Sequence, residues 1–223
     1  NNRLYDPLKL KVAAYYYNRA AEWKKEVSLS TKSQAYLAGS ILDFERQSRA
    51  PKELTSYVWQ PDDPIGPTFG YTTADRGSGD RTKDMSTTGA GGLIDRLVIN
   101  ISRNGNYLLN ISPRGDGTIP ENQQAVLRAI GAWLKVNGEA IYKTRPWIKS
   151  EEGKTHFTRN GNTLYAIALD WPTETLTLTS LGTSVGKVAK AELLTATGPQ
   201  EVKFTQDETA LKITPPETRI GEQ

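Results

Sequence analysis

Two patterns of hydrophobic residues predict an α/β region followed by an all-β region. From residue 6 to about residue 142, segments with helical spacing alternate with short strand-like segments, which is typical of a parallel sheet flanked by helices. Beyond Trp147, short segments alternate with period two between turns rich in Gly, Pro and Asp, which is typical of a small antiparallel sandwich. We therefore expect two domains, residues 1–147 and residues 148–223.

Three helices are predicted in the first region. Asp6-Pro7 is a typical helix start, with a capping side chain before proline at the first helical position, and residues 8–23 follow with helical spacing. Residues 93–101 carry one apolar stripe, which predicts a second helix. Thr118 to Glu121 resembles a capping box and opens a third helix that ends at Asn137-Gly138.

Four short apolar segments of the first region predict its strands: residues 26–30, 41–45, 55–59 and 107–111. A complete β/α barrel has eight strands in about 250 residues, so this number of strands predicts the C-terminal half of such a barrel. In the second region, the segments that predict antiparallel strands are residues 164–171, 174–181, 187–194, 202–205 and 210–214.

Composition excludes several classes of protein. No apolar run approaches the ~20 residues of a membrane-spanning helix, and the net charge of +3 is too small and too scattered for nucleic-acid binding. Cysteine is absent and His156 is the single histidine, which removes zinc-thiolate sites, cysteine nucleophiles and paired-histidine metal sites. We expect no metal and no cofactor, and we place His156 on the surface. The remaining catalytic chemistry depends on carboxylates, Tyr, Lys or backbone groups.

Polar side chains cluster where two predicted strands end. Asp43 and Glu45 are two residues apart, so both face the same way at the carboxyl end of a strand, where barrel enzymes carry their active sites. A carboxylate there is either a general acid or the ion-pair partner of a nearby arginine. On the next strand Trp59, beside Gln60 and Asp62, is either an aromatic platform for a sugar or a space-filling residue.

Three strings of this sequence carry a resemblance to a known family. They are LDFERQSRAPKELTSYVWQPDDPIGPTFGY, SRNGNYLLNISPRGDGTIP and GAWLKVNGEAIYKTRPW, and AYYYNRA before them also fits. In this order they resemble the C-terminal half of the catalytic barrel of α-L-fucosidases of glycoside hydrolase family 29. The resemblance covers about residues 8–147, and the family has a β-sandwich behind its barrel.

The resemblance implies a metal-free, retaining exo-glycosidase with an aspartate nucleophile and a glutamate acid/base. Glu45, in the string DFER, falls where the family has its acid/base. Phe69, in the string FGY, corresponds to the phenylalanine that packs against the C6 methyl group of fucose. Trp59 is expected to line the same pocket. Lys32 stands near the position of a basic residue that contacts sugar hydroxyls in some relatives.

This sequence also departs from the family pattern. The family nucleophile lies on a strand before the helix that ends in YYYN, whereas here only Asp6 precedes that helix, and Asp6 is interpreted as its cap. The paired histidines of the family are absent. The chain also begins at Asn1 without a methionine, which is typical of a processed or truncated product. We therefore expect an inactive C-terminal fragment that lacks its nucleophile.

The expected partners are a fucosylated glycan and the upstream half of the same protein, without nucleic acid or membrane, and an oligomer is possible. The resemblance implies a secreted, periplasmic or lysosomal protein whose signal lies upstream. Two alternatives remain open. One is a carbohydrate-binding module in which Trp147 or Trp171 of the β region holds the glycan. The other is a barrel glycosidase with a different sugar specificity.

Overall fold

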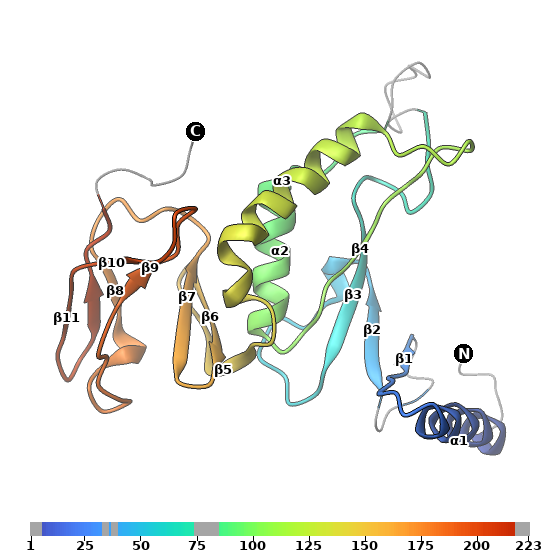
Figure 1. Cartoon of the computed structure of the whole chain (residues 1–223), viewed down its shortest axis with the longest axis horizontal. Coiled ribbons are helices and arrows are strands. Elements are labelled where there is room, and N and C mark those ends of the chain that lie inside the picture. Colours follow the sequence, from blue (N-terminus) through green and yellow to red (C-terminus); the bar gives the residue numbers. More distant parts are fainter. Residues whose placement is uncertain (1–5, 33–35, 37–39, 74–84, 217–223) are drawn as a thin grey trace. The chain divides into compact units, whose positions relative to one another are not determined.

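The computed structural model describes residues 6–32, 36, 40–73 and 85–216 of the chain (Figure 1). These residues form two compact units, here called unit 1 (residues 1–87 and 103–120) and unit 2 (residues 88–102 and 121–223). The units differ from the two expected domains, because helices α2 (Ala90–Ser102) and α3 (Glu121–Asn137) belong to the unit that holds the antiparallel sheets. The boundary between residues 147 and 148 stays a prediction.

Unit 1 contains a parallel sheet with the strand order β1-β2-β3-β4. Its strands are β1 (Ser30–Thr31), β2 (Ile41–Glu45), β3 (Trp59–Pro64) and β4 (Leu108–Asn110). A short 3₁₀ turn, η1 (Gln47–Arg49), follows β2, and helix α1 (Asp6–Glu22) precedes the sheet in the chain. Parallel strands agree with the sequence prediction, whereas closure of these strands into a barrel stays a proposal.

Strand β3 was expected over residues 55–59 but runs from Trp59 to Pro64. The register of the sheet explains the difference, because Leu42 of β2 pairs with Trp59 and the pairing continues to Asp62. Residues 55–57 form a turn instead, in which the Thr55 hydroxyl donates to the Tyr57 carbonyl at 2.7 Å. No strand signal is present in the sequence here because the segment contains Pro61 and Pro64, and proline cannot donate a hydrogen bond to a neighbouring strand.

Helix α1 exposes much of its apolar surface, which is unusual for a helix of a folded domain. The exposed side chains are those of Leu8, Leu10, Val12, Tyr15, Tyr16 and Tyr17. By contrast, α2 buries Leu93 and Val98 together with two polar residues. No helix in the described part of the chain is long and apolar enough to cross a membrane.

Unit 2 consists of α2, α3, two short 3₁₀ turns and three antiparallel sheets. The turns are η2 (Gly138–Ala140) and η3 (Thr179–Leu181). The strands are β5 (Arg145–Glu152), β6 (Thr155–Asn160), β7 (Thr163–Ala168), β8 (Leu176–Leu178), β9 (Glu192–Leu193), β10 (Gln200–Glu201), β11 (Phe204–Gln206) and β12 (Leu211–Ile213). They are arranged as β5-β6-β7, β11-β12-β8 and β10-β9.

The core of unit 2 joins the two three-stranded sheets. Phe157 of β6 packs with Leu178 of β8 and Leu211 of β12, and all three are buried. The Trp147 ring meets the Phe157 ring edge-on, with 5.2 Å between centroids. Trp147 is partly buried and packs against this core. Two sheets around one apolar core make the antiparallel sandwich that the sequence predicted.

Candidate active site

The register of unit 1 brings four polar side chains to one face of the sheet, at the carboxyl ends of its strands. Asp43 pairs with Gln60, and Glu45 pairs with Asp62. Alternate residues of a strand face the same side, so Asp43 and Glu45 of β2 share a face with Gln60 and Asp62 of β3. These four residues are called the strand-end cluster below.

Lys32, which directly follows β1, is the cation that contacts the strand-end cluster. Its ammonium group donates a hydrogen bond to Asp62 Oδ2, and it lies 3.8 Å from Glu45 Oε2 and 3.9 Å from Asp43 Oδ1. The hydrogen bond to Asp62 is the main cause that raises the pKa of Lys32, against partial desolvation and with the help of the surrounding negative charges. Lys32 therefore stays protonated and holds three carboxylates together.

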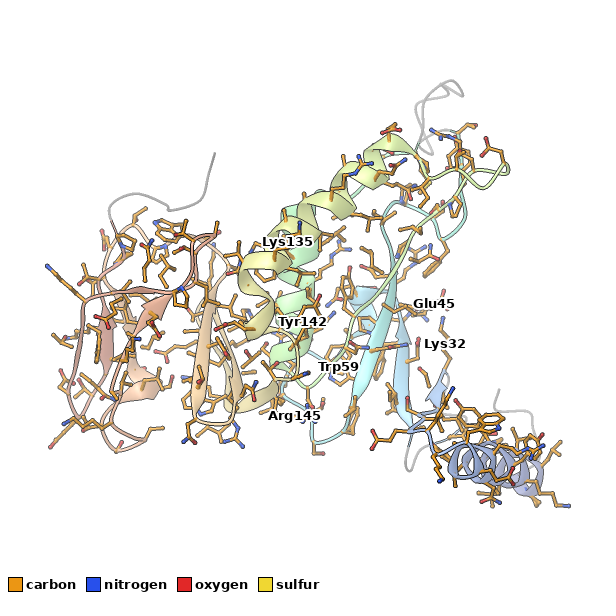
Figure 2. The ribbon with its side chains drawn as sticks, in the orientation of Figure 1. Lys32, Glu45, Trp59, Lys135, Tyr142 and Arg145 are labelled. Carbon is orange, nitrogen blue, oxygen red and sulfur yellow. The ribbon has the colours of Figure 1, made fainter. Side chains whose placement is uncertain are left out.

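Glu45 has the exposure and the freedom that a proton-transfer group needs. Its side chain is 48% exposed, whereas that of Asp43 is only 8% exposed. Among the described residues, Glu45 accepts no hydrogen bond, and its contact with Lys32 is a longer-range ion pair. Both of its carboxyl oxygens can therefore reach a substrate. Figure 2 shows Lys32 and Glu45 close together at the sheet.

Asp43 and Asp62 each have one oxygen without a hydrogen-bond partner in the described structure. Gln60 Nε2 donates to Asp43 Oδ2 at 3.0 Å, while Asp43 Oδ1 and Asp62 Oδ1 are buried and accept none. An unsatisfied buried acceptor is costly, so native proteins rarely retain one without a reason. These two oxygens are thus the buried acceptors of the strand-end cluster whose hydrogen bonding the described residues leave incomplete.

Phe69 lies in the loop after β3, and hydrogen bonds to β4 and the residues after it hold this loop in place. The Asn110 amide donates to the Phe69 carbonyl at 2.7 Å, and the Ser112 hydroxyl donates to the same oxygen at 3.2 Å. The Arg46 guanidinium lies 5.2 Å from the centre of the Phe69 ring. Since Arg46 follows Glu45, the structure brings Phe69 to the end of β2 that carries Glu45.

Trp59 is not brought to the strand-end cluster, contrary to our expectation. It is fully buried on the other face of the sheet, where its ring lies 6.1 Å from that of Phe44 and its indole N–H donates to the Arg103 carbonyl. Gly105 permits this packing, because a Cβ there would lie 2.6 Å from the indole. Consecutive residues of a strand point to opposite faces, so Gln60 faces the strand-end cluster and Trp59 packs on the opposite face of the sheet.

His156 is buried, although we expected it on the surface. Its exposed fraction is 4%, and its Nδ1 lies 3.0 Å from the Ser102 hydroxyl and 3.4 Å from Glu151 Oε2. A Ser-His-acid relay needs the serine and the carboxylate on opposite ring nitrogens. Here both contact the same nitrogen, so these residues join α2 to β5 and β6 and do not form a relay.

Two of the predicted site residues, Glu45 and Lys32, lie within one ion-pair distance of each other, and Phe69 approaches them through Arg46. Asp43 was a candidate carboxylate because its spacing of two residues from Glu45 placed both on one face, but no role in binding sugar was predicted for it. No feature of the sequence indicated that the Asp43 side chain is buried. Within the described residues, no group of three or more His, Cys, Asp or Glu side chains could hold a metal ion.

Comparison with known proteins matches both parts of the chain to one family. The family model described as Alpha-L-fucosidase matches residues 7–139, and the model described as Alpha-L-fucosidase C-terminal domain matches residues 150–223. Tissue alpha-L-fucosidase of Rattus norvegicus is 38% identical over 164 residues, covering 70% of this chain and 33% of that protein. The Homo sapiens tissue enzyme is 38% identical over 128 residues, covering 55% of this chain and 26% of that protein.

Solved structures agree with this assignment. The Thermotoga maritima alpha-fucosidase in complex with fucose has a TM-score of 0.70 and 29% identity, over 93% of this chain and 44% of that chain. An alpha-L-fucosidase from Paenibacillus thiaminolyticus has a TM-score of 0.67 and 25% identity, over 83% of this chain and 43% of that chain. The chain spans about a third or less of the length of the curated relatives named above. By sequence and by structure, the chain belongs to the alpha-L-fucosidase family.

Proposed function

We propose that this chain is the C-terminal part of a retaining exo-α-L-fucosidase, and that Glu45 is its general acid/base. The observation that carries the proposal is the position of Glu45. It is half exposed and accepts no hydrogen bond within the described residues, and it lies at a strand end beside Lys32 in a member of this family. Fucose in the related Thermotoga maritima structure supports the choice of sugar.

In the first step, the Glu45 carboxyl group gives its proton to the glycosidic oxygen while an aspartate attacks the anomeric carbon. The aglycone leaves, and a fucosyl-enzyme ester forms. In the second step, the Glu45 carboxylate takes a proton from a water molecule that attacks the same carbon. Free fucose leaves with its configuration retained, and the aspartate is released as a carboxylate. Retention requires a separation of about 5–5.5 Å between the two carboxyl groups.

The nucleophile in this proposal comes from a segment outside the 223 residues. The side chain of Asp43 accepts from Gln60 and that of Asp62 accepts from Lys32, so both carboxylates are held at the cluster. In our proposal Asp43 and Asp62 accept sugar hydroxyl groups through their free oxygens, and Lys32 donates to another. Phe69 covers the C6 methyl group, where an apolar surface favours a methyl over a hydroxymethyl group.

We propose a secreted, periplasmic or lysosomal location and a fucosylated glycan as the substrate. Relatives named plasma alpha-L-fucosidase support an extracellular setting for this type of enzyme. The upstream half of the barrel is the proposed partner of unit 1. The exposed apolar side chains of α1 support this, as do the outer edges of β1 and β4, which pair with no further strand in the described sheet.

The decisive experiment is an assay of residues 1–223 with an aryl α-L-fucoside, alone and with the upstream half of the barrel added in trans. We expect no turnover by the chain alone, because Glu45 lacks its carboxylate partner, and turnover after complementation. Aryl β-galactoside and α-glucoside serve as controls for a different sugar specificity. A well-packed chain that hydrolyses the fucoside without complementation would refute the assignment of the nucleophile. Sugar binding by residues 148–223 without any turnover would favour a carbohydrate-binding module instead.

A further inference from the structure

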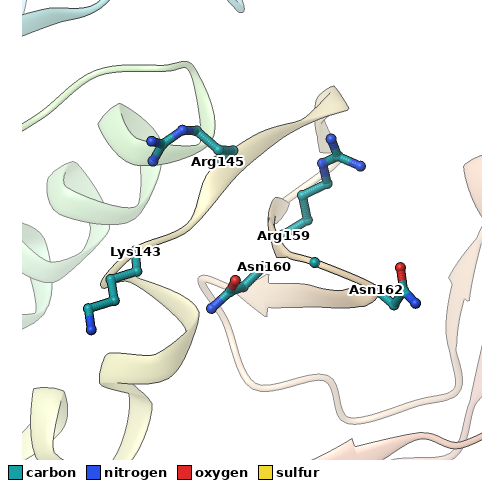
Figure 3. A pocket seen from close by; sticks show the side chains of 6 residues that line it. Lys143, Arg145, Arg159, Asn160 and Asn162 are labelled. Carbon is teal, nitrogen blue, oxygen red and sulfur yellow. The ribbon is translucent and has the colours of Figure 1, made fainter.

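Unit 2 contains a basic pocket that is separate from the strand-end cluster. Its volume is about 270 Å³, and Figure 3 shows the residues that line it. They are Lys143, Arg145, Arg159, Asn160, Gly161 and Asn162. Arg145 begins β5, Arg159 and Asn160 end β6, and Gly161 and Asn162 form the turn to β7. The name basic pocket refers to these six residues.

The sheet forces two like charges into adjacent positions in this pocket. Arg145 and Arg159 are directly opposite each other in the antiparallel pair of β5 and β6, so their side chains leave the sheet on one face. Like charges in such cross-strand positions are destabilising. Lys143 adds a third cation from a backbone with a φ of 60°, which residues other than glycine adopt infrequently.

No acidic residue compensates this charge in the described part of the chain. None of the three cations has a carboxylate within ion-pair distance there, and the one side-chain hydrogen bond of Arg145 goes to the Thr144 carbonyl at 2.9 Å. Other lysines nearby in the chain are paired: Lys149 of β5 with Glu152 at 3.5 Å, and Lys154 of the turn between β5 and β6 with Asp170. Pairing is thus available in this sheet and is missing where three cations border one pocket.

The chemistry of the lining selects an oxyanion on a polyhydroxylated ligand. A guanidinium group presents a planar fork of donors that matches sulfate and carboxylate groups. The Asn160 and Asn162 amides each offer both donors and an acceptor, which suits sugar hydroxyl groups. The pocket is an open depression lined by exposed residues, and its volume is close to that of the smallest ligand sites of proteins, which suits contact with one sugar unit that carries a charged substituent. Three cations are few for a nucleic-acid backbone, where many phosphate contacts supply the affinity.

We propose that the basic pocket binds an anionic sugar, carrying a sulfate or carboxylate group, of the glycan that the enzyme acts on. The choice of a glycan as the carrier of this charge rests on the proposed function. The pocket would recognise a charged unit of the same glycan, because one chain carries both the pocket and the strand-end cluster. It would thus add charge selectivity to an enzyme whose proposed sugar, fucose, is neutral.

The test is a binding titration on the whole chain, with heparin hexasaccharide as the sulfated and carboxylated probe. Wild type is compared with the double variant Arg145→Gln/Arg159→Gln and with Lys187→Gln/Lys203→Gln, a matched control that removes two exposed charges elsewhere in unit 2. We expect about tenfold weaker binding or more for the arginine variant, from the loss of charge-assisted hydrogen bonds, and less than about twofold for the control. A third variant, Asn162→Asp, puts a carboxylate into the pocket and should also weaken binding. Near-UV circular dichroism checks that each variant is folded.

Three results would overturn the proposal. Equal loss in the arginine variant and its control would show attraction by net charge only, and unchanged binding in both would place the ligand elsewhere. Tighter binding of a poly-glutamate peptide than of the hexasaccharide would make the pocket a contact for an acidic protein segment. Desulfated hexasaccharide separates the two anions, because retained binding assigns the site to carboxylate and lost binding assigns it to sulfate. The titration requires no hydrolysis, so a failed fucosidase assay and a failed binding test are distinguishable.

Discussion

Glu152 of unit 2 and the two aspartates of the strand-end cluster in unit 1 differ in how fully their carboxylates are hydrogen-bonded. In unit 2, both oxygens of Glu152 are occupied by backbone and hydroxyl donors of Thr179 and Ser180, at distances from 2.5 to 3.0 Å. In unit 1, Asp43 Oδ1 and Asp62 Oδ1 are buried without a hydrogen-bond partner in the described structure. The carboxylate of Glu152, which holds a turn, thus has donors for both of its oxygens, whereas Asp43 and Asp62 of the strand-end cluster each lack a donor for one oxygen. A buried acceptor that the fold leaves unsatisfied calls for a reason, and in our proposal that reason is the bound sugar.

The largest effect is expected from Glu45→Gln in the complete enzyme. Glutamine cannot give a proton to the leaving group, so hydrolysis of substrates with poor leaving groups should slow by about 10²–10⁴-fold. Activated aryl fucosides should suffer less in the first step, because their leaving groups need no proton. Steady-state kinetics over a series of leaving groups measures this, with Glu53→Gln, an exposed glutamate of unit 1, as the control. An equal loss for all leaving groups would remove Glu45 from the role.

Asp43→Asn tests more directly whether the carboxylates of the strand-end cluster serve substrate binding. This variant removes a buried charge and halves the acceptors that can meet a sugar hydroxyl, so kcat/KM should fall by roughly 10–150-fold, equivalent to ~1.5–3 kcal/mol. Stability should change little, because Asp43 Oδ1 accepts no hydrogen bond in the described structure and its ion pair with Lys32 spans 3.9 Å. Parallel fucoside kinetics and urea unfolding would separate the two effects. Lower stability with unchanged kcat/KM would mean that Asp43 serves the fold alone.

Phe69→Ala should have a smaller, substrate-selective effect. An apolar surface distinguishes a methyl from a hydroxymethyl group by only about 1–3 kcal/mol. The variant should lose that amount in kcat/KM for the fucoside and less for the matching galacto-configured substrate. Thermal unfolding should change little, because hydrogen bonds to the Phe69 carbonyl hold the loop and the ring adds only its contact with Arg46. Equal losses for both sugars would make Phe69 a structural residue.

Replacing Glu152 of unit 2, by contrast, should change only the stability of the protein. Burial acts to raise its pKa, but the hydrogen bonds from Ser180 and Thr179 outweigh burial and lower the pKa to about 2 from an ordinary value of 4.5. A depressed folded-state pKa stabilises the protein above pH 4.5, and this contribution is lost as the pH falls through about 2. Glu152→Gln should therefore cost about 1–3 kcal/mol at pH 7, and progressively less toward pH 2.

Urea unfolding of the wild type and of Glu152→Gln at pH 7 and pH 3 measures this difference. Glu201→Gln is the control, because the Glu201 side chain is 79% exposed and should change stability little at either pH. A cost of Glu152→Gln that does not shrink at low pH would show that packing and not ionisation makes Glu152 important.

Local signals in the sequence were enough to predict the three helices, the family and the position of Glu45 at a strand end. Helical periodicity and capping residues act over a few neighbouring residues, and α1, α2 and α3 follow them closely. The step of two residues from Asp43 to Glu45 is sufficient to place both on one face of a strand. Lys32 was chosen from the sequence because it stands near the position of a basic residue in some members of the family, and the structure places it directly after β1, which pairs with β2. Its contact with sugar hydroxyl groups stays a prediction.

Which residues meet across strands, by contrast, depends on the tertiary structure. The pairing of Leu42 with Trp59 turns Trp59 away from Glu45 and turns Gln60 and Asp62 toward it, and a shift by one residue would have reversed these roles. Strands β5 and β6 were missed because most of their side chains are polar or charged and give no apolar alternation, and the burial of His156 was missed with them. Register and burial depend on contacts between segments that are far apart in the chain. The periodicity of one segment carries no information about those contacts.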